Sequence, residues 1–293
     1  MTARVSVPAR RRAAVRGCLE KPAHLTAATS RAWNIHPEFH VKAHHFPWSP
    51  LPKRDFPHGH GNRRRVEHDF DPSARAAAKR LVFGADHADD TFIVLNASRP
   101  DVRKRIDLTL EGFACFARDK PPGVRLCLHH ALGLPDSAES CVARADALGI
   151  RDRLLLNPFA RLERVPADAE LNLLYNACDV GLNTAMGEGW GLVTFEHAAA
   201  GAPQIVPRHS ACADLWDGHA LLVPAATRYV PSFSILELAE VAPADVAAAL
   251  QTLYVDRRAH RELARAGLEY ARRPEFRWEA VAQRWGDVIH ELC

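Results

Sequence analysis

Short apolar runs that alternate with helix-type segments constrain this chain more than any other feature. From residue 91 onward, the runs are rich in Val, Ile and Leu and have the length of buried strands. They are residues 91–95, 124–129, 154–156, 180–182, 204–206 and 221–223, and helices are expected over 106–118, 138–148 and 168–177. Because such alternation requires crossover connections, it predicts the α/β class, with a parallel sheet and helices on both faces.

The two ends of the chain differ from this central pattern. Residues 1–55 contain Arg10-Arg11-Arg12 and many prolines without a sustained period, which predicts a poorly structured basic segment. Residues 245–293 have a helical pattern that Arg273-Pro274 interrupts, so a terminal helix is expected from about Phe276. The expected organisation is a poorly structured segment over 1–55 and one domain with a helical C-terminus over 56–293.

Composition excludes several classes of function. A formal net charge of +3 over 293 residues is too small to indicate a nucleic-acid partner. No apolar run approaches the roughly 20 residues that a membrane-spanning helix needs, so no transmembrane segment is expected. The seven cysteines form no C-x-x-C pair, which is typical of reduced thiols in a cytoplasmic protein.

The histidines near the N-terminus do not predict a metal site. His40 and His44 have the i, i+4 spacing of helical ligands, but Pro47 shortens any helix there. No cysteine or carboxylate completes a four-ligand set at a familiar spacing. Asp69-Phe70-Asp71 follows no apolar strand and is interpreted as a linker or helix N-cap. No metal and no other cofactor is therefore expected.

Two carboxylates eight positions apart flank a glycine-rich turn. Residues 187–191 alternate three glycines with Glu188 and Trp190, a composition that lets a ligand approach the backbone closely. A helix is expected from Leu192, and its first turn would offer free N–H groups to an anion. Glu188 and Glu196 could then bond the hydroxyls of one sugar nucleotide from two sides. The alternative is a glycine turn before a core helix, with two solvated glutamates.

A basic segment follows the first expected strand. Its cations are Arg99, Arg103, Lys104 and Arg105. A planar guanidinium and a compact ammonium suit a diphosphate. Because ligands on parallel sheets bind at the carboxyl ends of strands, this position favours a phosphate site over a solvated loop.

His209 and Cys212 follow the fifth expected strand at the same edge of the sheet. Their types invite a base and nucleophile interpretation, but the sequence offers no partner that would orient them. They are therefore expected only to line the pocket.

The glutamate pair resembles the E-x7-E signature of retaining glycosyltransferases with the GT-B fold, particularly the group-1 or family 4 class. The match runs from Glu188 to Glu196 as E-G-W-G-L-V-T-F-E, followed by A-A-A-G-A-P at 198–203. Residues 56–59, F-P-H-G, resemble the segment that opens the donor-binding half in this family. The resemblance covers about residues 56–293 and implies one Rossmann-like half of a GT-B fold.

The resemblance also implies roles for the charged residues. The catalytic residues would be Glu188, Arg99 and Lys104, and the donor-binding residues Glu196, Gly189, Trp190, Gly191, Leu192 and Arg103. Glu196 would accept hydrogen bonds from the ribose of a nucleotide diphosphate sugar, and Glu188 would hold the sugar. The cations would stabilise the departing diphosphate without a metal, because that group gains charge in the transition state. Ser98 and Arg105 stand where the family's basic motif has glycines, so either Arg99 or Arg103 could be the phosphate ligand.

Two other classes of protein fit the same residues. One is a module that binds a sugar nucleotide without transferring it, and the other is a sugar-nucleotide epimerase. A GT-B active site lies between two Rossmann-like halves, and residues 1–55 lack the alternating pattern of a second half. The chain alone is therefore expected to be a poor transferase. It would be part of a longer gene product, or a second chain would supply the acceptor half.

Overall fold

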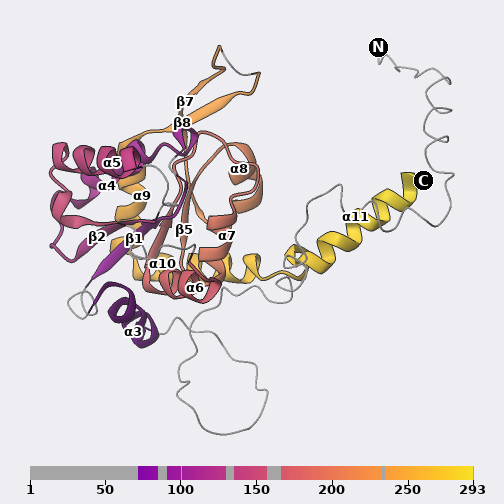
Figure 1. Cartoon of the computed structure of the whole chain (residues 1–293), viewed down its shortest axis with the longest axis horizontal. Coiled ribbons are helices and arrows are strands. Elements are labelled where there is room, and N and C mark those ends of the chain that lie inside the picture. The colour runs from indigo at the N-terminus through magenta and orange to yellow at the C-terminus, as the bar shows by residue number, and fades with distance from the viewer. Residues whose placement is uncertain are drawn as a thin grey trace, which may run out of the picture. The chain divides into compact units, whose positions relative to one another are not determined.

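The computed structural model of the chain describes residues 72–84, 91–99, 101–129, 135–156, 166–232 and 235–292 (Figure 1). The expectations for residues 1–55, including the histidines, lie outside these residues, as do those for residues 56–59 and 69–71. The domain boundary expected at residue 56 therefore stays a prediction.

Six parallel strands form the central sheet, in the order β3-β2-β1-β4-β5-β6 (Figure 1). They are β1 (Phe92–Asn96), β2 (Val124–Leu128), β3 (Leu154–Leu156), β4 (Val180–Leu182), β5 (Gln204–Pro207) and β6 (Leu221–Val223). Every neighbouring pair in this sheet is parallel. The predicted α/β class and parallel sheet are confirmed.

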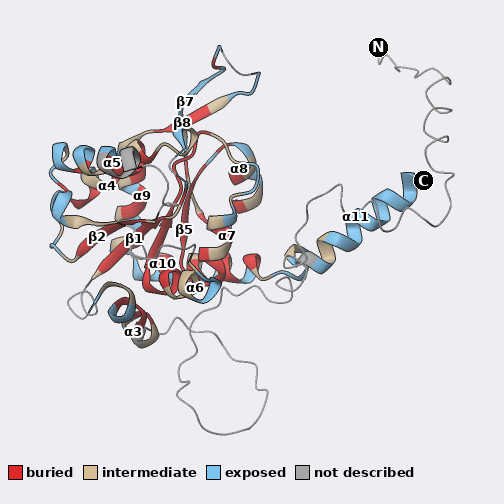
Figure 2. Ribbon diagram, in the orientation of Figure 1, coloured by how far each residue is buried: buried red, intermediate tan, exposed pale blue. Residues whose placement is uncertain are grey.

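Helices cover both faces of this sheet. One face packs on α4 (Ile106–Ala117), α5 (Pro135–Ala147) and α9 (Pro243–Val255), and the other on α6 (Asp168–Ala177), α7 (Leu192–Ala199), α8 (Ser210–Trp216) and α10 (Arg257–Ala271). In β1, Val94 belongs to the first core, whereas Ile93 and Leu95 belong to the second. This alternation follows from the two-residue period of a strand. Figure 2 shows the strands buried between the two helical layers.

The remaining helical elements lie before, between and after the strands and helices of this sandwich. They are α3 (Pro72–Phe83), the 3₁₀ turns η4 (Val102–Lys104), η5 (Arg151–Arg153) and η6 (Pro274–Phe276), and α11 (Trp278–Leu292). The predicted helical C-terminus, with its interruption at Pro274, is confirmed. Most of α11 is exposed (Figure 2). Within the described ranges, no helix has both the length and the apolar character to cross a membrane.

An antiparallel hairpin that the sequence pattern did not predict lies outside the main sheet. It consists of β7 (Ala225–Tyr229) and β8 (Leu238–Val241), with Tyr229 opposite Leu238 and an irregular register between Ala225 and Thr227. Four of the five residues of β7 are exposed. The strand therefore lacks the apolar alternation by which a half-buried strand is recognised.

A buried charge network fastens α3 to the amino end of β4. Asp179 precedes β4, and its Oδ2 lies 2.8 Å from Lys79 Nζ and accepts the Ile93 N–H at 2.7 Å. Arg75 Nε lies 3.8 Å from the second carboxylate oxygen. His260 on α10 lies 3.2 Å from the Asp179 carbonyl oxygen, and burial lowers the pKa of its ring to about 4. The Asp179 carboxylate thus joins α3 and β1, and the Asp179 backbone carbonyl adds a contact with α10.

Replacing Asp179 by Asn should destabilise the fold strongly. The substitution removes the negative charge that compensates two buried cations, and losing one partner of a buried pair costs about 3–5 kcal/mol. Urea unfolding would measure the loss. The control is Glu262→Gln, which breaks the exposed Arg258–Glu262 pair on α10 and should leave the unfolding midpoint unchanged. Equal effects of the two substitutions would contradict the prediction.

Candidate functional site

The site lies where the order of the strands reverses. The chain passes through β1, β2 and β3 toward one edge and then returns to place β4 beside β1. Open parallel sheets bind ligands at the carboxyl ends of strands next to such a reversal. The loops that follow β1 and β4 contain the two charged clusters singled out in the sequence. They meet there, because the Met186 N–H donates to the Arg103 carbonyl at 2.8 Å.

The basic segment after β1 is shaped by a 3₁₀ turn. The Asp101 side chain caps η4 by accepting the Arg103 N–H at 2.8 Å. Arg105 then adopts a left-handed conformation, with φ 48°, before α4 begins. Lys104 and Arg103 thereby reach the loop after β4. The exposed Arg99 side chain makes no hydrogen bond or ion pair with any residue that the structure describes.

Glu188 contacts both Lys104 and Arg103. Lys104 Nζ bonds to its Oε1, and Arg103 Nη1 lies 3.3 Å from its Oε2 and also bonds the Gly187 carbonyl. The Glu188 side chain is 8% exposed, whereas that of Arg103 is 43% exposed. A guanidinium has five N–H donors, so Arg103 retains donors that a ligand from solvent could use. Two cations against one carboxylate make this cluster attractive to an anion.

The start of α7 lies directly beyond this cluster. Gly191 is the N-cap residue with φ 84°, a conformation strained for any side chain, and no side chain caps the helix. Trp190 stacks on Phe195, with ring centroids 4.9 Å apart, which fixes the loop from its inner side. Leu192 is 60% exposed, and the space around Gly189 is open. The first N–H groups of α7 thus remain available to an anionic ligand.

Glu196 lies one turn into α7 and bonds Tyr175, a residue that no sequence motif indicated. The Tyr175 hydroxyl on α6 donates to Glu196 Oε2 at 2.8 Å. Burial raises the pKa of the Glu196 carboxyl, and the hydrogen bond from Tyr175 opposes that shift. Burial and the Glu196 charge raise the pKa of Tyr175, so its hydroxyl remains a donor. No hydrogen bond or ion pair in the described part of the chain joins Glu196 to Glu188.

The start of α8 supports the glutamate loop from a third side. The Glu188 N–H donates to Ser210 Oγ at 3.1 Å, and Ser210 Oγ lies 3.3 Å from Nδ1 of the buried His209. Burial raises the pKa of the Cys212 thiol to about 12, and the Glu188 charge adds to this shift. A thiol that is protonated at neutral pH is a poor nucleophile. His209 and Ser210 thus act here as supports of the loop.

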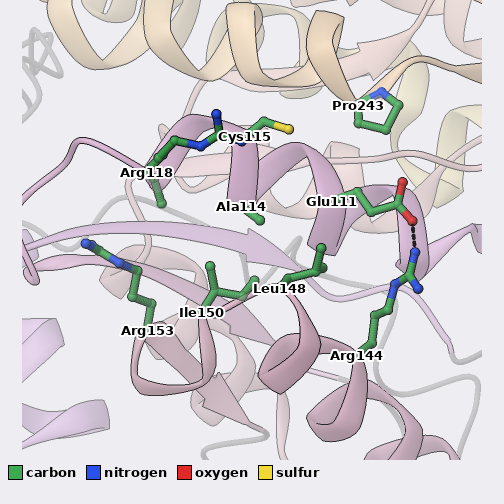
Figure 3. A pocket seen from close by; sticks show the side chains of 11 residues that line it. Glu111, Ala114, Cys115, Arg118, Arg144, Leu148, Ile150, Arg153 and Pro243 are labelled. Carbon is green, nitrogen blue, oxygen red and sulfur yellow. Dashed lines mark hydrogen bonds and ion pairs between the residues drawn. The ribbon is translucent and has the colours of Figure 1, made fainter.

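A cavity lies elsewhere in the domain, apart from the two charged loops. It has a volume of about 490 Å³ and lies between α4, α5 and the start of α9, and the Glu111–Arg144 ion pair borders it (Figure 3). It shares no lining residue with the two charged loops, and none of the predicted site residues lines it. Over the described ranges, no group of three or more His, Cys, Asp or Glu side chains could hold a metal ion.

Comparison with known proteins relates this chain to glycosyltransferases. Residues 65–285 match the family described as "Family 4 Glycosyltransferase in conflict systems". A D-inositol 3-phosphate glycosyltransferase of Segniliparus rotundus is 28% identical over 214 residues, which cover 73% of this chain and 42% of the relative. The chain therefore spans less than half the length of this relative.

Solved structures show the same fold at lower identity. A sucrose-phosphate synthase from Thermosynechococcus elongatus aligns with a TM-score of 0.56 and 23% identity, over 74% of this chain and 48% of that protein. Anabaena HepE, solved with UDP and glucose, aligns with a TM-score of 0.55 and 18% identity, over 73% of this chain and 52% of that protein. The sheet and its helices thus correspond to one half of a GT-B fold.

The burial of Glu196 predicts a pH-dependent effect on stability. Because burial raises the pKa of this carboxyl in the folded state, the wild type loses stability as the pH rises from the unfolded-state pKa of about 4.3 through the folded-state value. Glu196→Gln cannot ionise, so it should have a higher urea midpoint than the wild type at pH 7. The difference should shrink at pH 4. The same change at the exposed Glu269 should alter neither midpoint, and a gain for Glu196→Gln that is equal at both pH values would contradict the explanation.

Proposed function

The chain belongs to the family 4 glycosyltransferases of conflict systems, and from this premise we propose that it forms the donor-binding half of a retaining glycosyltransferase. The proposed donor is a nucleoside diphosphate sugar. The observation that carries the proposal is the contact of Lys104 and Arg103 with Glu188, beside the uncapped start of α7. A diphosphate that carries a hydroxylated sugar matches both signs of charge.

The proposed roles follow from the charge that develops during transfer. The diphosphate gains negative charge as the glycosidic bond breaks, so fixed cations and helix N–H groups stabilise the transition state more than the ground state. Lys104 and Arg103 supply the cations, and Arg99 is proposed as a further phosphate ligand. Because this positive charge comes from the protein, the proposed reaction runs without a metal.

The sugar and the ribose are assigned to the two carboxylates. Glu188 and the backbone of residues 189–191 would hold the sugar. Glu196 would accept hydrogen bonds from the ribose hydroxyls, and Tyr175 would fix its orientation from behind. UDP is the first probe to use, since HepE has been solved with UDP and with UDP-glucose. GDP and ADP belong in the same panel, because the base is left open.

A second Rossmann-like half is proposed to supply the acceptor site, either from a partner chain or from further sequence. The described residues form one Rossmann-like sheet. A donor site that is covered from one side only would position an acceptor poorly. The exposed apolar residues Trp285, Val288, Ile289 and Leu292 follow the i, i+3, i+4, i+7 spacing of one helical face on α11. That face offers a contact for the second half.

A cytoplasmic location is proposed from the cysteine content alone.

The two rival functions differ in their products. A binding module would leave a labelled UDP-sugar unchanged, and an epimerase would return it with an altered sugar. A transferase assayed together with its acceptor half would move the label to an acceptor and release UDP. Chromatography of the labelled products therefore distinguishes all three.

The first prediction for this site concerns the ribose. Glu196→Gln should weaken UDP binding by about 1.5–3 kcal/mol, because a charge-assisted hydrogen bond is lost. The same variant should bind 2′,3′-dideoxy-UDP as tightly as the wild type does, since that ligand lacks the hydroxyls. Calorimetry with both nucleotides provides the comparison. An equal loss for both ligands would indicate that Glu196 acts through the fold.

The second prediction concerns the diphosphate. Lys104→Ala should weaken UDP by at least about tenfold, since hydrogen bonds to charged groups contribute about 1.5–3 kcal/mol. Uridine binding should barely change, because the nucleoside carries no charge for Lys104 to meet. The matched control is Lys120→Ala, which removes an ammonium that pairs with Asp119 outside the site. Equal losses for UDP and uridine would exclude a phosphate role for Lys104.

A further inference from the structure

The β7–β8 hairpin bonds both loops that form the charged cluster. On the loop after β4, the Met186 carbonyl accepts the Ala239 N–H at 3.0 Å. The Leu238 side chain lies 3.6 Å from the position that a β carbon on Gly187 would take. On the segment after β1, the Arg105 guanidinium forms an ion pair with Glu240. One hairpin therefore touches two segments that lie about 80 residues apart in the sequence.

The side chains between these two points form a continuous row of contacts. The Tyr229 hydroxyl donates to Glu240 Oε1 at 3.1 Å and lies 3.0 Å from the Met186 sulfur. Arg105 directly follows Lys104, and Met186 precedes Glu188 by two positions. The row from Arg105 through Glu240 and Tyr229 to Met186 thus spans the Lys104–Glu188 pair from the hairpin side.

The backbone conformation of Arg105 indicates why its ion pair with Glu240 matters for the turn that carries Lys104. Its φ of 48° lies in the left-handed region, which a residue other than glycine occupies only when its surroundings hold it there. Asp107 holds one side of the guanidinium, at 2.8 Å, and Glu240 holds the other. The Arg105 side chain is 18% exposed and the Glu240 side chain 27% exposed, so this ion pair is better shielded from water than the pair with Asp107, whose side chain is 46% exposed. Without Glu240, the Arg105 guanidinium would lose one of its two carboxylate partners, and the turn that carries Lys104 would lose its ion pair with the hairpin.

We propose that the β7–β8 hairpin is a positioning element of the donor site, with Glu240 and Tyr229 as its positioning residues. Neither residue needs to touch the donor. They fix the two backbones that present Lys104 and Glu188, and thereby the separation of the ammonium from the carboxylate. The inference rests on the proposed function of this cluster.

The sign of one substitution separates positioning from simple electrostatics. Glu240→Gln removes a negative charge near a proposed phosphate site, which by electrostatics alone would strengthen the binding of an anion. Release of Arg105 as an additional cation would act in the same direction. A positioning role predicts the opposite result, a weaker complex. Tyr229→Phe changes no charge and should weaken binding as well.

Calorimetry with UDP tests the proposal. Glu240→Gln and Tyr229→Phe should each weaken UDP by about threefold to tenfold, which lies toward the lower end of the coupling found between neighbouring residues. In a Lys104→Ala background, neither should weaken it further. The control is Glu237→Gln, which removes the exposed ion pair of Glu237 with Arg228 on the same hairpin and should leave UDP affinity unchanged. Unchanged or tighter binding by Glu240→Gln, or full additivity with Lys104→Ala, would overturn the proposal.

Hydrogen exchange distinguishes failure of this inference from failure of the proposed function. Amides of residues 186–191 should exchange faster in Glu240→Gln than in the wild type or in Glu237→Gln, with or without UDP. Unchanged exchange would overturn the inference whether or not UDP binds. If no nucleoside diphosphate binds the wild type, the proposed function fails, and faster exchange in Glu240→Gln would still show that the hairpin holds the loop.

Discussion

The parallel pairing of β1 with β4 is the constraint on which the site depends. Val94 lies opposite Val180 and Leu95 opposite Gly181, so two segments about 86 residues apart end at the same edge of the sheet. A β carbon at Gly181 would lie 2.0 Å from Gln204 Oε1 on β5, so a side chain at this position would displace the buried Gln204 amide. Because the loops after β1 and β4 emerge side by side, their cations and carboxylate can meet.

The fold tolerates a partly buried carboxylate at this edge of the sheet because other contacts hold the surrounding helices and strands in place. Glu196 is partly buried, and burial opposes its ionisation. Helix α7, which carries Glu196, is fixed by an aromatic cluster. In it, the Phe195 ring centroid lies 4.7 Å from that of Trp216 and 5.2 Å from that of Phe276. At the opposite end of the strands, Asp179 fixes α3. The elements that present the site are thus held by contacts that do not include the site's own carboxylates.

Sequence patterns predicted most of the fold but only part of the site. Strands buried on both faces are apolar throughout, and that signal is local, so the sheet and its helices could be read directly. The glutamate loop and the basic segment could be located from residue types and strand ends. The partners could not be read, since the contacts of Glu188 with Arg103 and of Glu196 with Tyr175 depend on tertiary geometry. The hairpin was missed because exposed ribbon strands carry no apolar period.

The side chains of Glu188 and Glu196 contact partners on different faces of the sheet, and the Glu188 backbone also bonds Ser210 at the start of α8. Glu188 is held through Lys104 and the segment that leads into α4 on one face of the sheet, whereas Glu196 is held by Tyr175 on α6 on the other face. A ligand that engages both carboxylates must therefore contact the loop after β4 and the first turn of α7 together. Such a ligand would tie the two layers together, and its binding free energy would add to the stability of the folded state by mass action. The loop and the first turn of α7 thus lead the chain from the contact of Glu188 with Lys104, before α4, to the contact of Glu196 with Tyr175 on α6.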